Sequence, residues 1–338
     1  MTKPILTFRA RLDGKSSYFF HAVNILRWFD REHFCQVLPV VIEPGAIPKP
    51  LAEMIVHRDQ PTNKEVVIHD PTFDPVGESD KKVCFVTMWE TTRLPEPAVK
   101  NLNKAEVVVV PSKWQAEVFS AQGVTAPIRV VPMGVDPKRF PFQYREHRGP
   151  FVFGSAGNLA VGGCRKNMPG VIQAFQKADI PNSKLVIKTY PDDVLPEIED
   201  SRIEFQQVFL SSAEISSFYG RIDCFVSATR GEGWGLMQHE AMLSGVPVVS
   251  PAFGGISEFF DASVGYPVDY RTVESGKHYE NCGHWAEPST ESLIKGMKAA
   301  VGFEMHAQVR AARERVEGLT WGHSNTLLLE VLREFAYV

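Results

Sequence analysis

Short runs of apolar, mostly β-branched residues alternate with segments of helical periodicity along almost the whole chain. The predicted strands are residues 5–8, 37–42, 66–69, 83–87, 107–110, 128–131, 151–155, 185–189, 203–205, 224–227 and 246–250. The predicted helices include residues 16–29, 113–122, 169–178, 213–219 and 236–244. Several strands are apolar at every position, which is typical of parallel strands covered on both faces. The pattern therefore predicts a doubly wound α/β fold.

A change of pattern divides the chain into two halves. Residues 136–150 carry three prolines, many charges and no periodicity, and a new strand is predicted directly after them. We expect a first domain over residues 1–140 and a second over residues 151–320. A last helix, at about residues 321–338, has an apolar side formed by Leu327, Leu328, Val331, Leu332 and Phe335.

Composition and charge exclude several classes of protein. The 338 residues are 44% hydrophobic and 22% charged, which is ordinary for globular proteins and excludes a disordered chain. The chain has 36 Lys and Arg residues and 40 Asp and Glu residues, which gives a net charge of −4. Because no broad basic field is present, binding to nucleic acid through many phosphate contacts is disfavoured.

The cysteines and the N-terminal residues predict a reduced, cytoplasmic protein. The five cysteines lie far apart and form no C-x-x-C pair, so neither a zinc ribbon nor a disulfide framework is indicated. No signal-peptide core and no apolar run of about 18 residues occur, although peripheral membrane contact stays compatible with the sequence. His21 and His69 lack partners at metal-ligand spacing, so we expect structural histidines and no metal site.

Residues 227–250 contain the densest chemical signal. An apolar strand leads into a glycine-bearing loop with Glu232, and Glu240 follows eight residues later in a predicted helix. The pair is expected near the carboxyl edge of a parallel sheet, where doubly wound folds bind ligands. A carboxylate there suits sugar hydroxyls, since it accepts from two vicinal hydroxyls at once. The alternative interpretation is a helix-capping Glu232 and a solvated Glu240.

Two further segments indicate an anion site. In residues 151–178 a strand ends in a small-residue loop that contains Asn158, and Arg165 and Lys166 lie just before a helix. Two cations at a helix start are unfavourable unless an anion fills the site; the alternative is a solvated basic turn. Gly254 and Gly255 lie between a strand and a helix, where backbone N–H groups can bind an anion or a turn needs positive φ. No G-x-G-x-x-G opens a helix after the first strand and no Walker sequence occurs, which disfavours nicotinamide and P-loop interpretations.

These motifs together resemble the retaining GT-B glycosyltransferases of family 4, the group 1 glycosyltransferases, whose hallmark is a Glu-x7-Glu pair. The matching pieces are Glu232-Gly-Trp-Gly-Leu, Glu240-Ala-Met, Gly245-Val-Pro-Val-Val, and Gly254-Gly255 followed by Glu258. The resemblance implies that Glu232 approaches the donor sugar, that Glu240 holds the ribose, and that Arg165 and Lys166 grip the diphosphate as catalytic residues.

The resemblance also implies further site residues. On the donor side they are Glu240, Gly254, Gly255, Gly235, Leu236 and Asn158; many relatives carry an Arg where this chain has Asn158. On the acceptor side they are Gly14, Lys15, Glu90 and Arg93, with a buried ion pair as the alternative role of Glu90. The loops near residues 188–190 and 205–210 would choose between guanine and uracil.

The implied fold is GT-B: two facing Rossmann-like domains with an interdomain cleft, the last helix crossing back to the first domain. The implied activity is transfer of a hexose, with retention, from a nucleotide diphosphate sugar of the GDP-mannose or UDP-glucose type to an acceptor hydroxyl of a glycan, without metal or cofactor. Three alternatives stay open: the same chemistry on hydroxymethylated DNA, a sugar-nucleotide epimerase, and a non-catalytic sugar-nucleotide binding protein.

Overall fold

The computed structural model describes residues 5–14, 16–32, 34–42, 49–53, 55, 63–77, 80–144, 149–159, 163–210, 214–279, 281–302 and 306–338. The chain divides into two compact units. The first unit comprises Met1–Trp89, Arg93–Gly134 and Leu319–Val338, and the second comprises Glu90–Thr92 and Val135–Gly318. The predicted acceptor-side residue Lys15 lies outside the described residues.

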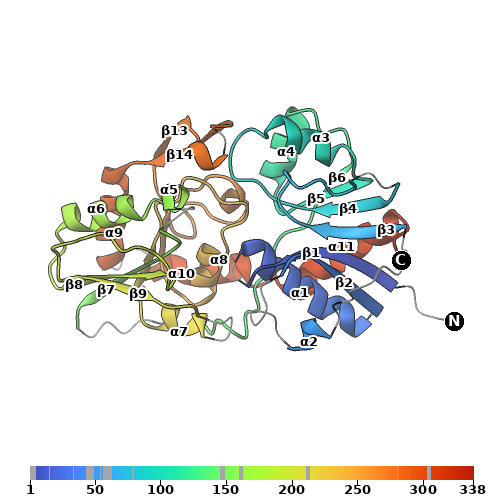
Figure 1. Cartoon of the computed structure of the whole chain (residues 1–338). Helices are drawn as coiled ribbons and strands as arrows, with labels where there is room; N and C mark the ends of the chain where they lie inside the picture. Colours follow the sequence, from blue (N-terminus) through green and yellow to red (C-terminus); the bar gives the residue numbers. More distant parts are fainter. Residues whose placement is uncertain are drawn as a thin grey trace. The chain divides into compact units, whose positions relative to one another are not determined.

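The first unit is built on a parallel sheet of six strands in the order β2-β1-β3-β4-β5-β6 (Figure 1). The strands are β1 (Ile5–Leu12), β2 (Phe34–Ile42), β3 (Lys64–Ile68), β4 (Lys82–Val86), β5 (Val107–Val110) and β6 (Ile128–Val130). The helices are α1 (Ser17–Glu32), α2 (Lys49–Ala52), α3 (Glu96–Leu102), α4 (Lys113–Ala121) and α11 (Trp321–Glu334).

The last helix packs on the first unit. Apolar residues of α11, among them Leu328 and Leu332, share a buried cluster with α1 and the sheet, and α11 lies beside α1 in Figure 1. The chain leaves this unit at Gly134, and the start of α11 packs directly against that glycine. A Cβ at Gly134 would lie 2.1 Å from the backbone nitrogen of Trp321, so only glycine leaves room for α11 there. The Thr320 side chain caps α11 by accepting from the His323 N–H.

The second unit has a parallel sheet of six strands in the order β12-β11-β10-β7-β8-β9. The strands are β7 (Phe151–Ala156), β8 (Ser183–Thr189), β9 (Ile203–Gln207), β10 (Cys224–Val226), β11 (Val248–Ser250) and β12 (Tyr266–Pro267). The α-helices are α5 (Gly163–Lys166), α6 (Met168–Ala178), α7 (Ile215–Gly220), α8 (Leu236–Leu243), α9 (Thr290–Val301) and α10 (His306–Val316). Numbered from β7, this strand order is that of a Rossmann fold, with its switch point between β7 and β10.

An antiparallel ribbon of β13 (Tyr270–Glu274) and β14 (His284–Pro288) completes the second unit. A short 3-10 helix, η1 (Gly255–Glu258), precedes β12, and a second, η2 (Lys277–Tyr279), lies in the connection between β13 and β14. The parallel sheets confirm the predicted α/β class. The prediction did not name the ribbon, α9 or α10, and it began β11 two residues early, at residue 246. Pro247 precedes the observed strand because proline has no N–H to donate to a ladder.

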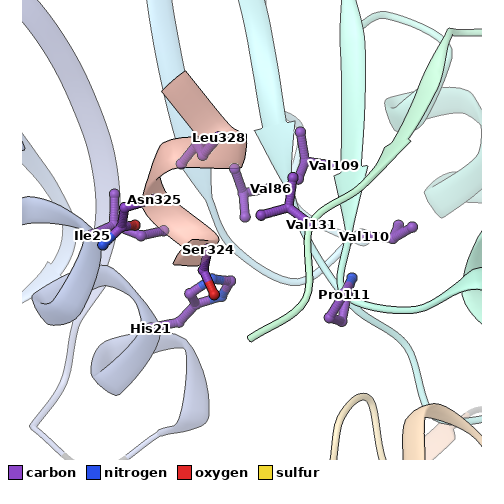
Figure 2. Close-up of a pocket in the computed structure, with 10 residues that line it drawn as sticks. All are labelled: His21, Ile25, Val86, Val109, Val110, Pro111, Val131, Ser324, Asn325 and Leu328. Carbon is purple, nitrogen blue, oxygen red and sulfur yellow. The ribbon is translucent and has the colours of Figure 1, made fainter. Parts of the chain in front are cut away.

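A small cavity in the first unit contains two buried polar atoms without hydrogen-bond partners among the described residues. The cavity measures about 10 Å³, close to the space of one water molecule, and is lined by residues of α1, β4, β5 and α11. Figure 2 shows His21 and Asn325 in its wall. His21 Nδ1 and Asn325 Oδ1 have no partner there, and burial lowers the pKa of His21 to about 4.

We predict that His21 makes the protein acid-labile. The folded state holds the pKa of His21 near 4, below the ordinary 6.5, so the neutral ring's contribution is fully present above pH 6.5 and is lost as the pH falls toward 4. The free energy of unfolding should drop by about 2 kcal/mol between pH 7 and pH 5 from this group. Urea unfolding of His21→Asn should show a shallower pH dependence, whereas a variant of exposed His323, His323→Asn, should keep the wild-type slope.

Candidate active site

The switch point of the second sheet brings the predicted catalytic residues together. Arg165 and Lys166 follow β7, and Glu232 follows β10, so all three lie beyond the carboxyl ends of neighbouring parallel strands. Ligands of open α/β sheets bind at such a point. A backbone hydrogen bond of 2.8 Å from the N–H of Arg230 to the carbonyl of Arg165 ties the two loops to each other.

Glu232 is buried and accepts three side-chain hydrogen bonds. Arg165 Nη1 donates to its Oε2 over 3.0 Å, and Lys166 Nζ donates to its Oε1 over 2.5 Å. The Thr229 hydroxyl donates to the same Oε1 over 2.8 Å. Both carboxylate oxygens are thus engaged. Glu232 is neither solvated nor a helix cap, since Gly235 is the N-cap of α8 and no side chain caps it.

Opposite charges fix the protonation of this cluster. Burial alone would raise the pKa of Glu232, but Lys166 and Arg165 lower it to about 2. Burial would likewise lower the pKa of Arg165, yet Tyr279, Glu232 and Glu90 raise it above its ordinary value. The pKa of Lys166 stays below its ordinary value because burial outweighs the attraction of Glu232. The carboxylate is therefore charged across the physiological range.

Arg165 and Lys166 lie just before α6, where the sequence predicted them. They also end the single-turn helix α5, which was not predicted, and α6 begins after Asn167, which has a φ of 51°. The charge facing them is the protein's own Glu232, so a bound anion is not needed to explain two adjacent cations.

Glycines let the Glu232 loop approach its neighbours. Residues Glu232 and Gly254 form a parallel bridge, and the N–H of Gly255 donates to the Glu232 carbonyl over 2.8 Å. A Cβ on Gly254, which has a φ of 76°, would lie 2.6 Å from that carbonyl oxygen. The N–H of Gly255 is therefore occupied by the chain itself, and the two glycines hold the loop rather than leaving both N–H groups open.

Glu240 occupies a different environment in the second turn of α8. The Tyr219 hydroxyl donates to its Oε2 over 2.8 Å. Burial raises the pKa of Glu240 to about 7, although the Tyr219 hydroxyl and the nearby Lys188 act in the opposite direction. Glu240 is thus poised to exchange a proton near neutral pH, whereas Glu232 is not.

The buried His239 holds α8 in place. The Trp234 indole N–H donates to His239 Nδ1 over 3.2 Å, and the other ring nitrogen lies 3.2 Å from the carbonyl of Val316. This pairing makes Nε2 the protonated nitrogen, and burial lowers the pKa of His239 to about 4. A neutral imidazole therefore links α8 to α10 directly before Glu240.

A cationic and aromatic surface lies close to Glu240. Lys188 Nζ lies 4.7 Å from the ring centroid of Tyr190, and that ring is 6.3 Å from the exposed Phe209. Lys188 is near enough to affect the pKa of Glu240. Lys188 lies in β8 and Tyr190 directly follows that strand, whereas Phe209 follows β9 (Ile203–Gln207).

The other predicted residues divide between the units. Gly235 has a φ of 98° at the start of α8, Leu236 follows it half-buried, and Asn158 lies two residues beyond β7. In the first unit, Gly14 has a φ of 75°, and Arg93 is an exposed residue whose carbonyl accepts from the Trp89 indole over 2.8 Å.

Glu90 is placed differently from the prediction. It was expected on the acceptor side of the first domain, but Glu90–Thr92 belongs to the second unit. Its Oε2 accepts from the Tyr279 hydroxyl over 3.0 Å. Thr91 Oγ1 donates to the Cys282 carbonyl over 2.9 Å, and Thr92 and His284 exchange two hydrogen bonds.

The sequence did not point to three polar residues of this site: Thr229 and Tyr219 bind the two glutamates, and Tyr279 binds Glu90. Lys188, which lies near Glu240, belongs to a segment that the sequence analysis had linked to the base. Of the first three, only Thr229 had a local signal, since it lies three residues before Glu232. The others come from distant elements, and their contacts depend on the tertiary fold.

Comparisons with known proteins relate this chain to sugar-transferring enzymes. Residues 138–277 match the family model of group 1 glycosyl transferases. These residues lie within the second unit. In sequence, the chain is 22% identical over 274 residues to the GtfA subunit of the UDP-N-acetylglucosamine--peptide N-acetylglucosaminyltransferase of Streptococcus gordonii. That alignment covers 76% of this chain and 51% of the relative, so the chain spans about half the length of the curated relative it matches.

Solved structures show the same fold over nearly the full length. Sucrose-phosphate synthase from Thermosynechococcus elongatus has a TM-score of 0.74 at 13% identity, covering 99% of this chain and 100% of that one. Anabaena HepE in complex with UDP-glucose has a TM-score of 0.72 at 16% identity, covering 98% and 100%. The likeness confirms the predicted GT-B fold of two Rossmann-like domains.

Among the described residues, no helix combines the length and the apolar character needed to cross a membrane. Within the same residues, no three His, Cys, Asp or Glu side chains are grouped so that they could hold a metal ion.

We predict that Glu240 destabilises the unliganded protein at alkaline pH. Its pKa is raised from 4.5 to about 7 in the folded state, so the protonated carboxyl's contribution is fully present below pH 4.5 and is lost as the pH rises through 7. Glu240→Gln should gain stability relative to wild type, by about 1 kcal/mol more at pH 8 than at pH 6. Urea unfolding tests this; Glu314→Gln, at an exposed position of α10, serves as the control. A gain independent of pH would contradict it.

Proposed function

We propose that this chain is a retaining glycosyltransferase of family 4 that transfers a hexose from a nucleotide diphosphate sugar to an acceptor hydroxyl. The observation that carries the proposal is the buried Glu232 carboxylate between Arg165 and Lys166 at the switch point of the sheet, within a group 1 glycosyltransferase domain. Sugar hydroxyls need a charged acceptor, and a diphosphate needs fixed cations.

Arg165 and Lys166 are the proposed diphosphate site. When the bond between the sugar and the diphosphate breaks, negative charge grows on the departing phosphate. Two half-buried cations held in place by Glu232 would stabilise that charge without reorganising. We propose that these side chains take the role that a divalent metal has in other sugar transferases, so that the reaction needs neither metal nor cofactor.

Glu240 is the proposed ribose ligand. A carboxylate in the second turn of α8 can accept from both ribose hydroxyls once it is ionised. Lys188 lies near Glu240, and the neighbouring rings of Tyr190 and Phe209 are the proposed stacking surface for the base. HepE was solved with UDP-glucose and a pneumococcal GtfA with UDP and GlcNAc, which favours uridine over guanosine as the nucleoside.

The site supports retention through a same-face reaction. Both oxygens of Glu232 already accept hydrogen bonds from Arg165, Lys166 and Thr229, so this carboxylate is a poor nucleophile at the anomeric carbon. We therefore propose that the acceptor hydroxyl attacks from the side of the departing diphosphate and that its proton passes to the phosphate oxygen. A glycan hydroxyl is the proposed acceptor.

Two measurements test this function. Calorimetric titration in EDTA against UDP-, GDP-, ADP- and dTDP-sugars should show binding of UDP-sugars, and a folded protein that binds none of them would contradict the proposal. In the absence of acceptor, slow hydrolysis of UDP-glucose, followed by NMR, should release α-glucose before mutarotation. Release of β-glucose would overturn retention.

We predict that donor affinity depends on the ionisation of Glu240. Since the pKa of this carboxyl is about 7 in the free protein and only the ionised form accepts from both ribose hydroxyls, UDP-glucose should bind about tenfold more tightly at pH 8 than at pH 6. Glu240→Gln should bind more weakly and lose this pH dependence. UDP-glucose is the ligand of choice because its diphosphate does not titrate in this range.

A further inference from the structure

We propose that Glu90, positioned by Tyr279, binds the attacking hydroxyl and also weakens the site's affinity for the free nucleoside diphosphate. This inference rests on the proposed function, because it assigns the second carboxylate of the same site. Glu90 and Tyr279 lie 189 residues apart in the sequence and are joined by a hydrogen bond.

The backbone of Glu90 packs against the loop between β10 and α8, which contains Gly231 and Glu232. A Cβ on Gly231 would lie 2.2 Å from the Glu90 carbonyl oxygen, so the two segments touch at this glycine. The Gly231 carbonyl also accepts a hydrogen bond from Arg165 Nη1 over 2.7 Å. The Glu90 backbone and the Arg165 guanidinium therefore both contact Gly231, the residue directly before Glu232.

Only one carboxylate oxygen of Glu90 accepts a hydrogen bond from another described residue. The Tyr279 hydroxyl donates to Oε2 over 3.0 Å, and Tyr279 is buried. Within the described residues, no hydrogen bond to Oε1 is present, and Glu90 is only half-buried. One carboxylate oxygen is thus oriented by the phenol, and the other is available to accept from a hydroxyl.

The position of Glu90 gives this oxygen a chemical role. Arg165 and Lys166, both influenced by the charge of Glu90, are the groups proposed to hold the departing diphosphate. A hydroxyl bound to Glu90 lies on the leaving-group side, as a same-face reaction requires. Its oxygen forms the bond to the anomeric carbon while the bond to the diphosphate breaks, and its proton passes to the departing phosphate oxygen.

The same charge opposes binding of the product. A carboxylate near the two cations repels a diphosphate, and it repels the free nucleoside diphosphate more than the nucleotide sugar, which has one negative charge fewer. Glu90 is then expected to favour product release. A glutamine at this position would accept the same hydrogen bond from Tyr279 without the charge, so Glu90→Gln separates the two roles from a structural one.

The test compares Glu90→Gln with wild type by calorimetry and by UDP-glucose hydrolysis, in which water is the attacking hydroxyl. UDP should bind about five- to tenfold more tightly to the variant than to wild type. The affinity for UDP-glucose should rise by a smaller factor. The kcat for hydrolysis should fall at least about tenfold. Tyr279→Phe should lower kcat while tightening UDP binding less than Glu90→Gln does.

Two matched variants serve as controls. Thr91→Val removes the hydrogen bond from the same segment to Cys282 and should not tighten UDP binding, and Tyr270→Phe, at an exposed tyrosine of β13, should leave both readouts unchanged. Unchanged or weaker UDP binding in Glu90→Gln, or unchanged hydrolysis, would overturn the inference while leaving the proposed function intact. Wild-type protein that binds neither UDP nor GDP would instead overturn the proposed function.

Discussion

The site depends on one buried carboxylate that is neutralised by two cations. Without Arg165 and Lys166, burial of Glu232 would raise its pKa, and without Glu232 two half-buried cations would repel each other. The cluster also joins the loops after β7 and β10, because Arg165 binds both the Glu232 side chain and the Gly231 carbonyl. Structure and chemistry at the switch point therefore rest on the same contacts.

Two glutamates eight residues apart are held in opposite states. Glu232 is paired with cations and has a pKa of about 2, whereas Glu240 faces a phenol and has a pKa of about 7. The first stays charged and pairs with both cations, which form the proposed diphosphate site. The second is about half ionised at neutral pH in the free protein, and under the proposed ribose role hydroxyl groups that bind the carboxylate would favour loss of its proton. Different neighbours thus give the two carboxylates different protonation states.

Much of this arrangement could be predicted from local pattern. Apolar strand runs indicated the parallel sheets, and the order of motifs around Glu232 predicted the GT-B fold. Contacts between distant segments could not be predicted in the same way. Tyr219 and Tyr279 read as ordinary aromatic residues, and only the folded chain places their hydroxyls on Glu240 and Glu90. Glu90 lies in the N-terminal half of the sequence, yet its contacts group the segment Glu90–Thr92 with the second unit.

The central claim is that Glu232 with its two cations and Glu240 hold opposite ends of a nucleotide sugar. A crystal structure of the protein with UDP tests it most directly. The account predicts ribose hydroxyls within hydrogen-bond distance of the Glu240 carboxylate and diphosphate oxygens on Arg165 and Lys166. Density for UDP away from the carboxyl ends of β7 and β10, with neither Glu240 nor the two cations in contact, would contradict it.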